Sequence, residues 1–375
     1  MNDWQVTGDA QRAAWADKRL PEVEQVRPGL WSIPVAMTGN PLRYVLIYAL
    51  EVPDGVALID TGWPSRAAWT ALQDGLRAIG YDVSQIRHIA ITHFHPDHFG
   101  LVPRVLEHTD ATVAMHRNDS REIDHRTDAE EELEKSQLAD QLLAYGAPVD
   151  EVSSLRGGLV RFAGGRTVDT ELVDGSDVGF PGWHLKAVWT PGHTPGHLCF
   201  LDEQAGVLFS GDHLLPRISP NISVMPLQTG HHPLGEYLLS LQNSVDIPDV
   251  EVLPSHEYRF TGIASRATEL LAHHEARLEE MTQAIVERPG RTTWDVAAAV
   301  HWSRPFDGMG VNQRRMAATE THAHVLVLVE RGIVRADTTT PMLRWYPNTA
   351  TASSEPGQPA DAHSSDATSA DRVRA

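Results

Sequence analysis

The sequence predicts an α/β fold built in layers, followed by a smaller helical domain. Between residues 44 and 116, short apolar runs and amphipathic stretches follow one another as strand, helix, strand, helix and strand, a succession typical of layered α/β proteins. Beyond residue 261, apolar residues recur at helical spacing along "GIASRATELLAHHEARLEEMTQAIVER". The chain has 375 residues, of which 41% are hydrophobic, enough for one large domain and a smaller partner.

The elements of the first half follow from their composition and from the residues at their ends. Residues 44–50 and 55–60 are two β-rich runs joined by the hairpin signal "EVPDG". Residues 65–80 predict a helix that begins after the N-cap Ser65 and ends at Gly80. We expect the layers to continue with strands over 86–92 and 111–116 and with helices over 97–109 and 117–146.

The second half predicts further strands and then mainly helices. Short apolar runs joined by tight turns predict strands over 184–190, 197–203, 206–211 and 249–256. After them, the pattern predicts three helices and a short hairpin, over 262–288, 292–302, 313–332 and 333–346. Three helices with a β-hairpin indicate a small winged-helix-like domain.

These patterns divide the chain into four regions. Residues 1–24 form a polar N-terminal arm, and residues 25–260 form the main α/β domain. Residues 261–347 form the helical, winged-helix-like domain. Residues 348–375 are low in large apolar residues and rich in Ser, Ala, Asp and Pro, so we expect a disordered tail.

Charge and cysteine content limit the classes of function. With 50 Asp and Glu against 31 Lys and Arg, the formal net charge is −19, and such a surface disfavours nucleic acid as a partner. Cys199 is the single cysteine, which excludes an internal disulfide and a metal site built from thiolates. The N-terminus lacks the apolar core of a signal peptide and no apolar run reaches membrane-spanning length. We therefore expect a cytoplasmic location and no membrane partner.

The stretch "ITHFHPDHFG" (91–100) places three histidines and an aspartate within six consecutive positions at the end of an apolar run. The imidazoles of His93, His95 and His98 would repel one another as cations, and as spectators they would add nothing to stability. Their spacing is explained if they share a positive ion with Asp97. Because thiolates are excluded, histidine and carboxylate are the ligand types that remain.

Further ligand-type residues stand where predicted strands give way to loops. Asp60 lies in "LIDTG", His193 and His197 lie in "TPGHTPGH", Asp212 lies in "SGDHL", and His256 lies in "LPSHEY". Each of these segments follows an apolar strand run. We therefore expect their side chains to gather at one edge of a pair of sheets.

This ordered set of motifs resembles the metallo-β-lactamase superfamily over residues 28 to 260. The resemblance implies an αββα sandwich with a two-metal site at its rim. The implied ligands are three residues for each ion and one shared aspartate: His93, His95 and His193; Asp97, His98 and His256; and Asp212.

The resemblance also implies roles around the ions. Asp60 would orient a ligand, and His197 would likewise lie behind the ligands. Two divalent ions are implied as cofactors, zinc first, with iron or manganese as alternatives. Bound ions lower the pKa of water from 15.7 toward ~7. Asp97 is then the candidate catalytic residue, because it would bind a metal with one oxygen and orient the hydroxide, or accept its proton, with the other.

These features predict a metal-dependent hydrolase, although the substrate class is open. β-Lactamases of the superfamily place Cys or Ser at the bridging position, so Asp212 argues against lactam hydrolysis. Branches that resemble this chain include glyoxalase II thioesterases, lactonases, tRNA-processing ribonucleases and a lactamase-like group with a C-terminal winged helix, which matches best. We expect metal-bound hydroxide to attack a small acyl substrate: a thioester, ester or lactone. The alternative is an endoribonuclease or other phosphodiesterase, and the complete ligand set disfavours a non-catalytic regulator.

The helical domain is expected to serve substrate selection or assembly of a homodimer. A winged helix that reads DNA needs several basic or amide side chains along its recognition helix. In "QRRMAATETHAHVLVLVERG", such residues stand only at the start, at Gln313, Arg314 and Arg315. The remainder is apolar or acidic, which favours burial over DNA binding.

Overall fold

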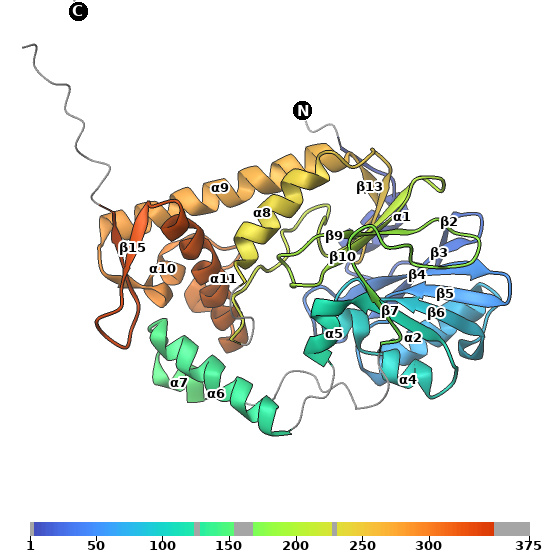
Figure 1. Ribbon diagram of the computed structural model, residues 1–375, viewed down its shortest axis with the longest axis horizontal. Coiled ribbons are helices and arrows are strands. Elements are labelled where there is room, and N and C mark those ends of the chain that lie inside the picture. The colour runs from blue at the N-terminus through green and yellow to red at the C-terminus, as the bar shows by residue number, and fades with distance from the viewer. Residues whose placement is uncertain (1–3, 124–127, 154–167, 227–230, 349–375) are drawn as a thin grey trace, which may run out of the picture.

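The computed structural model describes residues 4–123, 128–153, 168–226 and 231–348, and its centre is a pair of β-sheets packed face to face (Figure 1). The first sheet has seven strands, in the spatial order β2 (Glu24–Arg27), β3 (Leu30–Ala36), β4 (Tyr44–Val52), β5 (Gly55–Ile59), β6 (Ile86–Ala90), β7 (Thr112–His116) and β8 (Thr170–Leu172). The second has six, in the order β1 (Gln5–Val6), β13 (Phe260–Thr261), β12 (Glu251–Pro254), β11 (Val207–Gly211), β10 (Leu198–Asp202) and β9 (Lys186–Trp189).

Apolar side chains from both sheets fill the space between them. Tyr48 of β4 and Phe209 of β11 meet edge to face, with ring centroids 5.2 Å apart. The buried Tyr48 hydroxyl donates a hydrogen bond of 2.8 Å to the carbonyl oxygen of Pro254, so its polar end is satisfied inside the core. The alternating apolar residues of the predicted strands account for this inner layer.

Helices cover the outer face of each sheet, which completes the αββα sandwich. The seven-stranded sheet packs against α2 (Arg66–Ala78), α3 (Pro96–Phe99) and α4 (Val102–Leu106). The six-stranded sheet packs against α8 (Pro233–Ser244) and α9 (Ile263–Glu287). The fold class predicted for the main domain is therefore confirmed.

The C-terminal region extends the outer helix layer and shares its core. It consists of α9, α10 (Thr293–Ala299), α11 (Val311–Glu330) and a three-stranded sheet of β14 (Arg291–Thr292), β16 (Arg344–Pro347) and β15 (Val334–Asp337). Two helices from the middle of the chain, α6 (Asp128–Ala144) and α7 (Val149–Ser153), lie beside α10 and α11 and away from the sheets (Figure 1). The N-terminal α1 (Asp9–Ala16) and α5 (Arg117–Ile123) complete the described helices of four residues or more.

Most predicted elements are present, with some differences. Ser65 is the N-cap of α2, and its hydroxyl oxygen accepts a hydrogen bond of 3.1 Å from the Ala68 amide. The single helix predicted over 97–109 was wrong: two short helices occur there, because the first ends at Gly100. Strands β2 and β3 and helix α8 were not predicted. Pro34 obscures the strand pattern of β3, and "HHPLG" before α8 has the composition of a loop.

The limits of the four predicted regions stay predictions. Gln5 and Val6 of the predicted arm pair with Thr261 and Phe260 at the edge of the six-stranded sheet. The predicted tail, apart from its first residue, lies outside the described residues. None of the described helices is both long and apolar enough to cross a membrane.

Strand pairing brings the ends of several strands to one edge of the sandwich. β5 and β6 run parallel with Ile59 opposite Ala90, and β11 and β12 run parallel with Gly211 beside Pro254. Because parallel strands end at the same edge, the segments that follow each pair meet. The turn between the antiparallel strands β9 and β10 reaches the same place, since the backbone of Leu198 bonds to that of Thr92, just after β6.

Candidate metal centre

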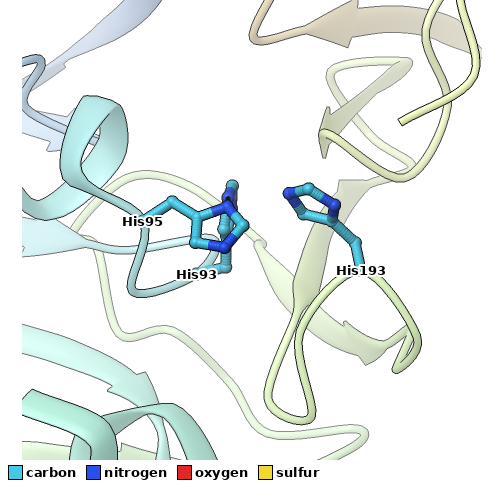
Figure 2. Close-up of side chains that lie close together, drawn as sticks. All are labelled: His93, His95 and His193. Carbon is cyan, nitrogen blue, oxygen red and sulfur yellow. Dashed lines mark hydrogen bonds between the residues drawn. The ribbon is translucent and has the colours of Figure 1, made fainter. Parts of the chain in front are cut away.

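The first cluster of ligand-type side chains consists of His93, His95 and His193, called here the His193 group. His93 and His95 lie in the loop between β6 and α3, and His193 faces them from the turn between β9 and β10 (Figure 2). One ligand atom from each lies within 4.8 Å of the others. His93 Nε2 and His95 Nδ1 are 3.0 Å apart, close to the roughly 3.3 Å expected for two nitrogens on one tetrahedral zinc ion.

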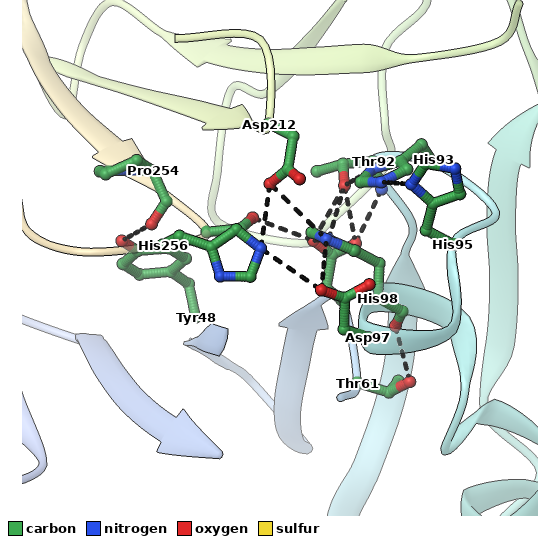
Figure 3. Close-up of polar contacts among 12 residues, drawn as sticks. Tyr48, Thr61, Thr92, His93, His95, Asp97, His98, Asp212, Pro254 and His256 are labelled. Carbon is green, nitrogen blue, oxygen red and sulfur yellow. Dashed lines mark hydrogen bonds and ion pairs between the residues drawn. The ribbon is translucent and has the colours of Figure 1, made fainter. Parts of the chain in front are cut away.

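The second cluster consists of Asp97, His98 and His256, called here the His256 group. Asp97 and His98 lie in α3, and His256 follows β12 (Figure 3). His256 Nε2 is 3.3 Å from Asp97 Oδ2, and His98 Nε2 is 3.7 Å from the same oxygen. His98 and His256 have no exposed surface, so this cluster is part of the protein interior.

Asp212 lies between the two groups. Its Oδ2 is 3.5 Å from His193 Nε2, whereas its Oδ1 is 3.6 Å from His98 Nε2 and 3.4 Å from His256 Nε2 (Figure 3). Each carboxylate oxygen therefore faces a different group. This is the arrangement that a bridging carboxylate requires.

Asp60 holds both the His98 ring and the loop that bears the first histidines. Its Oδ2 is 2.8 Å from His98 Nδ1, and its Oδ1 accepts a 2.8 Å hydrogen bond from the Thr92 amide. On the other side of the group, His256 Nδ1 lies 3.0 Å from the carbonyl oxygen of Tyr44. Because each distal nitrogen is engaged, each Nε2 is aimed at the centre. Asp60 thus contacts the candidate ligand His98, and its orienting role stays a prediction.

His197 contacts the backbone of Asp212. The Asp212 amide donates a hydrogen bond of 3.1 Å to His197 Nε2, and His197 Nδ1 lies 2.8 Å from the Thr190 hydroxyl. Since Nε2 accepts, Nδ1 must bear the proton and donate to Thr190. Both ring nitrogens are therefore engaged by Asp212 and Thr190, and the role of His197 behind the ligands stays a prediction.

Asp119, at the start of α5, was missed by the sequence analysis. Its carboxylate accepts hydrogen bonds from the Phe94 amide (3.1 Å), the Thr194 hydroxyl (2.7 Å) and the Gly196 amide (2.6 Å). Phe94 stands between His93 and His95, and Thr194 follows His193. A Cβ on Gly196 would lie 2.5 Å from Asp119 Oδ1, so only glycine permits this approach. Asp119 therefore joins the two loops of the His193 group.

Charges in the centre favour ionised carboxylates and a neutral His95. Burial, together with the neighbouring His193, lowers the pKa of His95 to about 3. Burial opposes ionisation of Asp97, but His98 and His256 outweigh it and lower the pKa of Asp97 to about 2. Burial likewise opposes a charge on His98, yet Asp97 and Asp60 raise its pKa to about 9. Binding of a cation would therefore displace a proton from the His256 group.

Several buried polar atoms at the centre lack a hydrogen bond within the part of the chain that the structure describes. They are His98 Nε2, His193 Nε2, His256 Nε2 and Asp212 Oδ1. An unpaired buried polar atom costs about 1–3 kcal/mol, and these four face one shared space. Divalent cations, one in each group, would satisfy these atoms, and nitrogen and oxygen donors are those that zinc and iron accept. The residues present therefore fit metal ions.

Comparisons with known proteins agree with this geometry. The family model of the metallo-beta-lactamase superfamily matches residues 40–256. A lactamase-like protein of Aspergillus niger, adaB, is 28% identical over 73% of this chain and 69% of its own length. A probable metallo-hydrolase of Bacillus subtilis, YqjP, is 25% identical over 76% of this chain and 87% of its own.

Solved structures show the same relationship. A metallo-beta-lactamase family protein from Thermus thermophilus is 30% identical, with a TM-score of 0.72, and the match covers 86% of this chain and 100% of that one. A beta-lactamase domain protein from Burkholderia ambifaria is 27% identical, with a TM-score of 0.70 over 87% of this chain and 93% of its own. With its sandwich, its histidine and aspartate clusters and these relatives, the chain belongs to the metallo-beta-lactamase superfamily.

Proposed function

We propose that this chain is a hydrolase that binds two divalent ions, one in each histidine group, and cleaves a thioester, ester or lactone. The observation on which the proposal depends is the position of Asp212. One of its oxygens lies 3.5 Å from His193 Nε2 and the other lies 3.4 Å from His256 Nε2. A carboxylate shared in this way suits two neighbouring cations, since it reduces their mutual repulsion.

Bound ions would lower the pKa of water toward neutrality and withdraw charge from a substrate oxygen. The chain's own residues then position and receive protons. Asp97 turns Oδ2 toward His98 and His256, which leaves Oδ1 to accept the proton of the attacking water. His95 is half-buried, whereas His98 and His256 are fully buried, so we place the substrate on the side of the His193 group.

Zinc is the proposed metal, with iron or manganese as alternatives. The donors are imidazole nitrogens and carboxylate oxygens, and the one cysteine, Cys199, is buried in the sheet strand β10 and bonded to Thr190 and Ser210. Imidazole and carboxylate sites of this composition suit zinc and iron. Elemental analysis of the protein purified without added metal tests this choice.

The proposed substrate class follows from charge and from relatives. The net charge of −19 opposes binding of a phosphate backbone, which favours a small acyl substrate over RNA. The probable metallo-hydrolase of Bacillus subtilis, 25% identical to this chain, supports hydrolysis in general. RNA cleavage remains the alternative, and the assay below distinguishes the two.

For the C-terminal region we propose a winged-helix-like domain that selects substrate or joins two copies of the chain. Its order, α9, β14, α10, α11, β15 and β16, supports the comparison with a winged helix. Along α11 the residues Ala323, Val325, Val327 and Leu328 are buried in the core that α8 and α9 also share. This burial supports the prediction that α11 packs inside the protein and does not enter a DNA groove.

A substrate screen tests the proposed function. Full-length zinc-loaded protein is assayed with acyl thioesters, lactones, carboxylic esters and short single-stranded RNA, and Asp212→Ala serves as the blank. We expect turnover of at least one carboxyl derivative that the variant lacks. Cleavage of RNA alone would replace this proposal with the nuclease, and turnover that persists in Asp212→Ala would refute both.

A further inference from the structure

The ring nitrogen of His193 that faces away from Asp212 contacts a distant part of the chain. This part belongs neither to β9 nor to β10, the strands on either side of the His193 turn. His193 Nδ1 lies 3.0 Å from the carbonyl oxygen of Asn221. Asn221 belongs to residues 215–223, called here the connecting segment, which follows β11 and Asp212. The carbonyl accepts only if Nδ1 is protonated, which leaves Nε2 free to face Asp212. The orientation of His193 therefore depends on where the connecting segment lies.

Helix α11 fixes the Asn221 side chain at both of its polar ends. The Asn221 amide nitrogen donates a hydrogen bond of 2.6 Å to Glu320 Oε2. The Asn221 amide oxygen accepts a hydrogen bond of 2.5 Å from the Ser223 hydroxyl, which in turn accepts one of 3.0 Å from Thr319. Thr319 and Glu320 are consecutive residues of α11. The asparagine is therefore held by a helix almost a hundred residues later in the chain.

Helix α9 holds the start of the same segment. Arg266 donates hydrogen bonds to the carbonyl oxygens of Leu215 and Ile218, at 2.7 and 3.1 Å. His274 Nε2 lies 3.2 Å from the Ser219 hydroxyl, and His274 Nδ1 lies 3.1 Å from His324 of α11. The whole connecting segment is thus attached to the C-terminal helices.

We propose that Asn221 and Glu320 are positioning residues for His193, and that through them the C-terminal helices set metal affinity at the His193 group. The inference rests on the proposed metal-dependent function. The His256 group needs no such support, because His98 and His256 are held by Asp60 and by the carbonyl oxygen of Tyr44, both within the sandwich.

The expected size of the effect follows from the geometry that metal binding requires. Ligand distances in a zinc site vary by only about 0.2 Å. If Glu320 is removed, the Asn221 amide loses its partner, and the carbonyl that holds His193 is free to shift by more than that. Loss of a group that orients a metal ligand typically weakens metal binding 10- to 100-fold. We expect the zinc dissociation constant of the His193 group to rise by this factor.

A double-mutant cycle in the full-length chain isolates the effect, with zinc as the probe and a competing chelator to measure dissociation constants. His256→Ala leaves the His193 group, and His193→Ala leaves the His256 group. We expect Glu320→Ala to weaken zinc binding 10- to 100-fold in the His256→Ala background and less than twofold in the His193→Ala background. Glu320→Gln keeps an acceptor oxygen for Asn221, so we expect it to restore affinity to within threefold of the parent.

Glu275→Ala is the matched control, because Glu275 likewise anchors the C-terminal helices, through two 2.7 Å hydrogen bonds from Arg331, but does not touch Asn221. It should leave both dissociation constants unchanged. Equal weakening in both backgrounds, or none in either, would overturn the inference. Absence of zinc binding in the parent protein would instead overturn the proposed function. If Glu320→Ala does not fold, Ser223→Ala replaces it, because this variant removes the hydrogen bond to the Asn221 side-chain oxygen. The zinc dissociation constants in the two backgrounds are then compared in the same way.

Discussion

The two histidine groups of the metal centre differ in what holds them. In the His256 group, the outer contacts come from Asp60 and Tyr44, which lie at strands β5 and β4 of the sandwich. In the His193 group, the Thr92 hydroxyl, which Asp60 holds, lies 3.1 Å from His93 Nδ1. The other supports come from Asp119 of α5 and from Asn221 of the connecting segment, which α11 holds in turn. One group is therefore part of the sandwich core, whereas the other is assembled from loops and helices around it.

If the proposed function holds, this difference separates binding of the ions from selection of the substrate. The His256 group is buried and would bind its ion through Asp97, His98 and His256 with little dependence on neighbouring loops. In the His193 group His95 is half-buried, and the proposed substrate lies on this side. Changes in the segments that support the His193 group can therefore alter one ion and the substrate together while the sandwich stays intact.

The largest effect is expected when Asp212, the residue that lies between both groups, is replaced. Asp212→Ala should lower kcat/KM by roughly 10³-fold or more and should reduce bound zinc from about two ions to one or fewer. His93→Ala and Asp97→Ala should also abolish hydrolysis in a folded protein, since each removes a ligand. Elemental analysis and circular dichroism measure these outcomes, with the exposed Asp246→Ala as control. If the active enzyme contained less than one metal ion per chain, the proposal of two bound ions would be wrong.

Asp60→Asn should act mainly on the His256 group, because Asp60 reaches the His193 group only through Thr92. Asn keeps the backbone conformation of residue 60, whose φ of 61° is left-handed. However, the side-chain NH2 group of Asn would face the Thr92 amide or His98 Nδ1, both of which donate to the carboxylate of Asp60. One of these donors would then lose its acceptor. We expect zinc binding in the His193→Ala background to weaken 10- to 100-fold and the free energy of unfolding to fall by about 1–3 kcal/mol. A comparable loss in the His256→Ala background would mean that the groups do not have separate supports.

Asp119→Asn should act on the opposite group and somewhat less strongly. Both oxygens of Asp119 accept hydrogen bonds, so an amide group would leave at least one of the donors on Phe94, Thr194 and Gly196 unpaired. We expect zinc affinity of the His193 group to fall about tenfold, with Asp60→Asn as the reciprocal control. Chelator competition in the two single-group backgrounds measures it. Unchanged affinity together with reduced stability would assign Asp119 a structural role only.

The sequence points to the candidate ligands of both groups, and the two groups differ in how well it indicates their supports. Residues that end a buried strand are recognisable from the apolar run before them, and this rule singled out Asp60, His193, Asp212 and His256. The same rule applies to Asp119, which closely follows the strand Thr112–His116, but a lone carboxylate in "HRNDS" gives no pattern of its own.

Other features could not be predicted from the chain alone. Asn221 holds His193 with a backbone carbonyl, a group that every residue possesses. Glu320 reaches Asn221 across 99 residues of sequence, and only the packing of α11 against the connecting segment brings them together. On the scale of the fold, alternation of strands and helices predicted the α/β layers, and the family resemblance implied the sandwich. Strand β3 was missed because Pro34 interrupts its pattern.

The smallest expected effect is a pH dependence that originates at Glu320, in the support of the His193 group. Burial raises the pKa of Glu320 from 4.5 to about 7, so between these values the folded state binds its proton more tightly than the unfolded state does. The stability that this group contributes is therefore present at low pH and declines as the pH rises toward 7.

Glu320→Gln does not titrate and keeps an acceptor for Asn221. Its free energy of unfolding, relative to the parent, should rise between pH 4 and pH 8 by on the order of 1 kcal/mol, because partial exposure reduces the full value. Hydrogen bonding to Arg331 lowers the pKa of Glu275 from 4.5, so Glu275→Gln should lose stability relative to the parent as the pH rises toward 4.5, with little change above it. Chemical denaturation at a series of pH values measures both slopes, and slopes of the same sign would show that the Glu320 carboxylate is hydrated.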